Sequence, residues 1–203
     1  LLQEGIEAFN RREYGSALTI FRSTIETRRS FPEAEYWIGR IFEQEGEYRL
    51  ALEQYKLALS QSDLLYIPEE RYTILYRMAR IQELLKDYNS YEETLKRIIA
   101  LSHGEDTTEE MKQAMVSAFQ SRGLDRYFVL FRSREKPKAR AFGELGLFYY
   151  RTGRYREASE KLILSITIPV SISIDYLRER DPDYEFFAVD LFFEDAYKDR
   201  TIL

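Results

Sequence analysis

Apolar residues recur along this chain at helical spacing, in blocks that are separated by turn residues. The block from about Gly15 to Arg28 is one example, with its large side chains on one helical face (Ala17, Leu18, Phe21, Ile25). Each block is too short to bury its apolar face alone, so it needs a partner helix. The pattern predicts helix pairs at 1–30, 33–62, 68–103 and 137–168, and a degenerate pair at 104–135.

The second pair repeats the first after 34 residues. Small residues coincide with small ones and large with large (Gly5 with Gly39, Ala17 with Ala51, Tyr14 with Tyr48, Phe21 with Tyr55). A fixed period of this length is typical of a helical repeat array, in which neighbouring pairs bury one continuous core. The third pair aligns with the second at an offset of 40, but there Tyr91 replaces Ala51, so we expect a wider helix crossing.

The second and fifth pairs resemble the tetratricopeptide repeat. The matching positions are Gly39, Phe42, Gly46, Tyr48, Ala51, Tyr55 and Ala58 in one, and Leu145, Gly146, Tyr149, Gly153, Tyr155, Ala158 and Leu162 in the other. Antiparallel helices cross closely only where side chains are small, and large residues fill the notch beside them. The resemblance implies an all-α, right-handed superhelical solenoid of about five antiparallel helix pairs over residues 1–168.

The remaining 35 residues, 169–203, form a C-terminal extension of different character. We expect Ile168-Pro169 to end the last repeat helix and Val170–Ile174 to be extended or a short helical start. A further helix is predicted at Asp183–Lys198, with a wide apolar arc that includes Phe186, Phe187, Phe192 and Phe193. It would cap the open end of the solenoid, or dock in the chain's own groove or into a partner.

Composition excludes several functions. The net charge is −5, which argues against nucleic acid as a partner. The chain has no cysteine, so disulfides, thiol catalysis and zinc fingers are excluded, and its one histidine, His103, has no ligand partners at metal-binding spacing. No nucleotide-binding or hydrolase motif occurs. We therefore expect a protein that is not an enzyme and binds no cofactor or metal.

No apolar run approaches the ~18 residues that span a membrane. Since Leu1 lies within a repeat, we expect residues before it, where a signal or lipid anchor would lie, so no compartment is indicated.

In this family the first helix of each pair lines the concave groove, which holds a peptide or helix of another protein. The corresponding positions are Leu2, Ile6, Phe9 and Asn10; Tyr36, Arg40, Glu43 and Gln44; Tyr76, Arg80, Glu83 and Leu84; and Arg140, Gly143, Leu147, Tyr150 and Arg151. The first set is apolar where the clamp for acidic chaperone tails has Lys and Asn, which excludes that partner.

The sharpest polar signal is a repeated Tyr-x3-Arg-x2-Glu, at Tyr36 and again at Tyr76. This spacing keeps the three side chains on one helical face. Arginine beside tyrosine could accept a carboxylate or a backbone carbonyl from a partner. Alternatively, Arg and Glu of neighbouring helices pair with each other as a solvated ladder.

A basic run extends from Arg122 to Arg140, and the segment from Asp175 to Arg200 is acidic. The two could attract each other or an anionic partner, or form ordinary solvated faces. The sequence thus favours a protein–protein interaction scaffold or adaptor. The alternatives are a structural component that self-assembles, as a homo-oligomer, through the aromatic C-terminal helix, and a small-ligand-binding accessory protein of a bacterial envelope or transport system.

Overall fold

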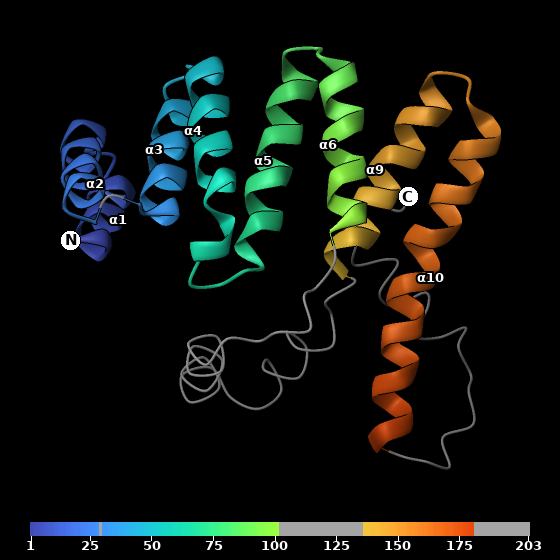
Figure 1. Cartoon of the computed structure of the whole chain (residues 1–203). Helices are drawn as coiled ribbons and strands as arrows, with labels where there is room; N and C mark the ends of the chain where they lie inside the picture. The colour runs from blue at the N-terminus through green and yellow to red at the C-terminus, as the bar shows by residue number, and fades with distance from the viewer. Residues whose placement is uncertain (29, 102–135, 181–203) are drawn as a thin grey trace. The chain divides into compact units, whose positions relative to one another are not determined.

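A computed structural model describes residues 1–28, 30–101 and 136–180, and every regular element within these residues is a helix (Figure 1). The predicted pair at 104–135, most of the basic run, and the Asp183–Lys198 helix with its four phenylalanines lie outside the described residues. No described helix is long and apolar enough to cross a membrane.

The helices follow one another in pairs. Their bounds are α1 (Leu2–Asn10), α2 (Tyr14–Arg28), α3 (Pro32–Gln44), α4 (Tyr48–Ser60), α5 (Glu70–Leu84), α6 (Tyr88–Ala100), α9 (Lys136–Arg151) and α10 (Tyr155–Arg180), with a short 3₁₀ turn η1 (Ser62–Leu64) after α4. The chain forms two compact units, Leu1–Thr94 and Leu95–Leu203, each described here by itself. Each of the pairs predicted at 1–30, 33–62, 68–103 and 137–168 is observed as two successive helices.

The two helices of each described pair are joined by the same turn. In the second pair the Glu47 N–H donates to the Phe42 carbonyl at 2.9 Å and the Gly46 N–H to the Glu43 carbonyl at 3.3 Å, while Gly46 is left-handed with φ of 79°. This is the Schellman motif, which satisfies the last carbonyls of a helix. The equivalent left-handed residues in the other turns are Arg12, Lys86 and Gly153, with φ of 63°, 58° and 80°.

A glycine–large residue contact brings the helices of a pair together. A methyl group on Gly39 would lie 2.6 Å from Cε1 of Tyr55, and one on Gly146 would lie 2.8 Å from Cγ of Leu162. Gly5 fits against the Phe21 ring in the same way. These distances are shorter than van der Waals contact, so only glycine allows the observed crossing. The predicted notch beside small residues is thus present in three pairs.

The first core joins the first pair to the second. Its buried residues are Ala8, Phe9, Ala17, Phe21, Phe31, Ala34, Ile38 and Ile41. Trp37 of α3 packs on this core, with its ring centroid 5.1 Å from that of Phe9 and 6.2 Å from that of Phe21. The first helices of successive pairs, α1 and α3, are therefore in direct contact.

The predicted end of the last repeat helix at Ile168-Pro169 is wrong, because α10 continues to Arg180. Val170–Ile174 is helical, neither extended nor a new helical start. A proline inside a helix removes one backbone hydrogen bond and strains the preceding turn. However, no glycine and no second proline lies between Tyr155 and Arg180, so the flanking residues sustain the helix through Pro169.

Candidate functional site

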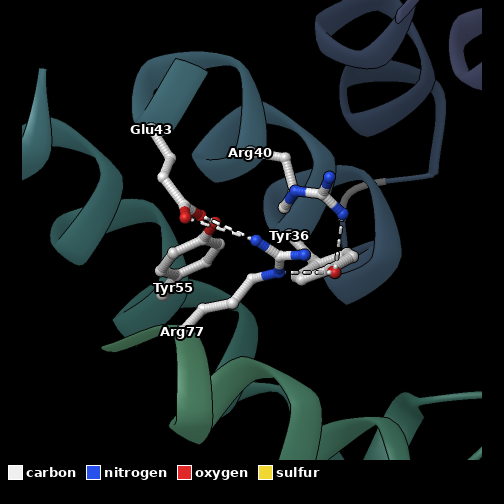
Figure 2. A network of polar contacts seen from close by, with 5 residues as sticks. All are labelled: Tyr36, Arg40, Glu43, Tyr55 and Arg77. Atoms are coloured by element: carbon white, nitrogen blue, oxygen red, sulfur yellow. Dashed lines mark hydrogen bonds and ion pairs between the residues drawn. The ribbon is translucent and has the colours of Figure 1, made fainter. Parts of the chain in front are cut away.

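A polar network joins α3, α4 and α5 around the carboxylate of Glu43 (Figure 2). Its Oε2 accepts the hydroxyl of Tyr55 at 2.6 Å and Nη1 of Arg77 at 3.1 Å. The side chains are 9% exposed for Glu43 and 25% for Arg77, so the pair is largely desolvated. Removing either partner would leave an uncompensated charge, and we conclude that Arg77 neutralises Glu43.

The hydroxyl of Tyr36 links the two arginines of the network. It accepts Nε of Arg77 at 3.1 Å and Nη1 of Arg40 at 3.2 Å (Figure 2). A phenolic oxygen has one proton of its own to donate. Within the described residues Tyr36 makes no hydrogen bond as a donor, so its O–H is available to an acceptor from outside.

Arg40 lies among aromatic rings. Its Cζ is 5.1 Å from the ring centroid of Phe9, 5.3 Å from that of Trp37 and 5.9 Å from that of Tyr36. These distances are within the range of cation–π attraction. Among the described residues no carboxylate lies within ion-pairing distance of Arg40, and its buried Nε has no hydrogen-bond acceptor.

The electrostatics keep the network charged. Burial raises the pKa of Tyr55, as do its hydrogen bond to Glu43 and that residue's charge. Burial alone would lower the pKa of Arg77, but the contacts with Tyr36 and Glu43 outweigh it, and the pKa is raised. Arginine does not lose its proton in proteins. The network therefore contains two guanidinium groups and one carboxylate, which is an excess of one positive charge.

The structure brings together three of the predicted groove residues, Tyr36, Arg40 and Glu43, with Arg77 in the place expected for Arg80. Arg80 is exposed, as are Gln44, Glu83 and Leu84, whereas Tyr76 is half-buried. Glu43 pairs with an arginine of the next pair, as the ladder alternative expects, but this ion pair is largely desolvated rather than solvated. The ladder alternative does not describe Arg40.

Sequence reasoning missed Arg77, although a signal for it exists. At the offset of 40 that relates the second and third pairs, Arg77 corresponds to Trp37. Trp37 reaches back to Phe9 of the preceding pair, and Arg77 reaches back to Tyr36 and Glu43 in the same manner. This helix position therefore faces the preceding pair, whatever residue occupies it.

The predicted groove residues of the first pair differ in their burial. Phe9 is buried, with Tyr14 at 5.5 Å and Trp37 at 5.1 Å between ring centroids, and it forms the floor beneath Arg40. Leu2 and Ile6 are half-buried against the same core, and Asn10 is exposed. An apolar strip on α1 therefore adjoins the Arg40 site.

The fifth pair belongs to the second unit and lacks the Tyr-Arg-Glu arrangement. Its Arg140 pairs with Glu144 at 2.7 Å along α9. Tyr150 is 61% exposed and meets Tyr155 edge to face at 5.6 Å, and Arg151 is exposed beside it. Gly143 and Leu147 offer no charge. This face presents aromatic surface rather than a cation among rings.

A second cluster of charge lies where α3 and α5 begin. Glu33 is 6% exposed and its Oε1 accepts the Tyr66 N–H at 2.8 Å, which fastens the connector after η1. Burial and the charge of Glu33 raise the pKa of Glu70 to about 7. No group of three or more potential metal ligands occurs within the described residues.

Comparison with known proteins bears on the repeats. Residues 2–64, the first two pairs, match the family described as tetratricopeptide repeat. A protein of Treponema pallidum (strain Nichols), described as uncharacterized, is 30% identical over 161 residues. That match covers 77% of this chain and 43% of the relative, so the chain spans less than half of the relative's length.

Among solved structures, the chain is similar to YrrB, described as a TPR protein with an unusual peptide-binding site, at 19% identity and a TM-score of 0.44 over 97% of this chain and 90% of that one. It is also similar to MamA, at 14% identity and a TM-score of 0.43 over 91% and 93%. The family match identifies residues 2–64 as tetratricopeptide repeats. The other described pairs have the same turn as these repeats.

Proposed function

We propose that this chain is a non-enzymatic scaffold that holds a peptide or helix of another protein along the first helices of its first three pairs. Tetratricopeptide repeat proteins are generally protein-interaction scaffolds without catalytic activity. Because the chain spans only part of its relative, the proposal concerns this region and leaves the activity of a longer protein open.

The observation that carries the proposal is the environment of the Arg40 guanidinium. Arg40 is half-buried, lies over three rings and has no carboxylate partner within the part of the chain that the structure describes. Buried charges in a protein core are normally paired, so this environment is unusual. Arginine and aromatic residues are also the side chains that contribute most to protein interfaces. Arg40 and its rings therefore have the composition of an interface centre.

The surroundings of Arg40 also favour an extended partner. The α1 strip of Leu2 and Ile6 supplies apolar contact on one side, and α5 supplies Tyr76 and the exposed Arg80 on the other. A partner that covers all three helices would bury aromatic area at the centre and meet polar groups at the rim, which is the usual anatomy of an interface.

A site-specific crosslinking experiment tests this proposal. A photo-crosslinking amino acid would replace Gln44, exposed at the end of α3, or Glu53, exposed on α4. In cells that make the protein, we expect one defined adduct from position 44 and none from position 53. Equal adducts from both positions, or none from position 44, would contradict binding along α1, α3 and α5.

A further inference from the structure

The excess charge beside Tyr36 points to a specific ligand group, on the premise that the proposed scaffold function holds. Arg77 and Glu43 already neutralise each other at 3.1 Å, whereas Arg40 donates only to a neutral hydroxyl within the described residues. We infer that Arg40 and the Tyr36 hydroxyl together bind the side-chain carboxylate of an acidic residue in the partner peptide.

The hydrogen-bonding groups of the site require an acceptor. The guanidinium of Arg40 carries only donors, and the Tyr36 hydroxyl, which already accepts two N–H groups, has only its proton left to offer. A primary amide would bring donors of its own that find no acceptor here. A carboxylate has no donor, and its two oxygens can accept both groups at once.

The charge balance selects among anions. One carboxylate brings two guanidinium groups and Glu43 to neutrality. A phosphate close to two negative charges would leave the network negative next to the desolvated Glu43, whose side chain is 9% exposed. Like charges at short range in a partly dry site repel strongly. A single carboxylate is therefore the better match.

The position of Arg40 favours a side chain within the peptide over its C-terminus. Arg40 lies on α3, with α1 contacting it through Phe9 and α5 approaching through Arg77 and the shared Tyr36 hydroxyl. A chain that crosses these helices continues on both sides of Arg40. The Phe9 and Trp37 rings would meanwhile cover the stem of the acidic side chain and exclude water from the ion pair.

The chain contains its own probe for this site. Trp37 is the only tryptophan, and its ring centroid is 5.3 Å from the Cζ of Arg40. Its fluorescence should change when a carboxylate binds. Linear peptides would be selected on the full chain from a random phage-displayed library and then synthesised with free and with amidated C-termini. Each acidic residue would be replaced in turn by its amide, and Kd measured from Trp37 emission.

We expect one internal Glu→Gln or Asp→Asn replacement to weaken binding at least about tenfold. Arg40→Gln should cause a similar loss, with no further loss when the two changes are combined. Arg40→Lys, which keeps the charge but not the planar fork, should bind with intermediate affinity. Arg49→Gln, at an exposed position on α4, should bind as the wild type does, and circular dichroism would verify that each variant is folded.

The results of this experiment distinguish failure of the carboxylate site from failure of the proposed scaffold function. Selected peptides that bind without any acidic residue, or regardless of Arg40, would overturn the carboxylate site and leave the scaffold in place. Loss of binding on C-terminal amidation alone would overturn the side-chain assignment in favour of a terminal carboxylate. Failure to select any peptide would count against both proposals.

Discussion

The glycine notch of the second pair gives a stability prediction that can be worked from distances. In Gly39→Ala the new methyl would lie 2.6 and 2.7 Å from two ring atoms of Tyr55 and 3.3 Å from the Ala51 carbonyl. Comfortable carbon–carbon contact is about 3.5–4.0 Å, so the ring must move by about 1 Å. Tyr55 is fully buried and its hydroxyl is tied to Glu43 at 2.6 Å, so the ring cannot easily yield.

Overpacking of this kind costs about 1–3 kcal/mol, whereas alanine in a helix gains about 0.5–1 kcal/mol over glycine. Gly39→Ala should therefore lower the free energy of unfolding by up to about 2.5 kcal/mol. Gly15→Ala is the matched control, because nothing lies within 4 Å of a methyl there, and it should raise the free energy of unfolding by up to about 1 kcal/mol.

Urea unfolding followed by Trp37 fluorescence is the appropriate assay, since Trp37 lies on the same helix as Gly39 and packs on the first core. In a repeat protein stability is largely local, so the probe must lie near the change. If Gly39→Ala shifted the midpoint upward as Gly15→Ala does, the account of close helix crossing would be refuted.

Two further predictions concern Glu70 and Pro169. Folded Glu70 keeps its proton to a pKa of about 7 and unfolded Glu70 to about 4.5, so the folded chain binds more protons in this window and stability should fall as pH rises through it. Glu70→Gln should flatten that dependence in urea midpoints at about pH 5 and 8; an unchanged slope would contradict it. Pro169→Ala should stabilise α10 by up to about 3 kcal/mol, measured by thermal unfolding followed by circular dichroism. Pro137→Ala is the control and should be nearly neutral, because Pro137 lies in the first turn of α9. If Pro169→Ala did not raise the stability, the helix would have to end at Pro169.

The features that sequence predicted well depend on short-range pattern. Gly39 and Tyr55 are 16 positions apart in one helical hairpin, and a period of 34 repeats their relation at Gly5 and Phe21. Helical spacing fixes which side chains meet within such a hairpin, so the sequence pattern is enough to predict the notch and its turn.

The polar network was only half predictable because it depends on contacts between pairs. Tyr36, Arg40 and Glu43 share one face of one helix, and their grouping follows from spacing. Arg77 and Arg80 are three positions apart and face directions that differ by about 60° around α5. Which of them reaches Glu43 therefore depends on the rotation of α5 against α3. Pro169 shows a second limit: the local penalty of one proline was smaller than the gain from the rest of α10.

The four hairpin turns also distribute strain unevenly along the chain. The left-handed position is glycine in the second and last described pairs but Arg12 and Lys86 in the first and third. A left-handed residue with a side chain costs about 1–2 kcal/mol, which glycine avoids. Both side chains are exposed and belong to no part of the Arg40 network. Glycine at these two surface positions would therefore stabilise the individual hairpins without altering the surface proposed for binding.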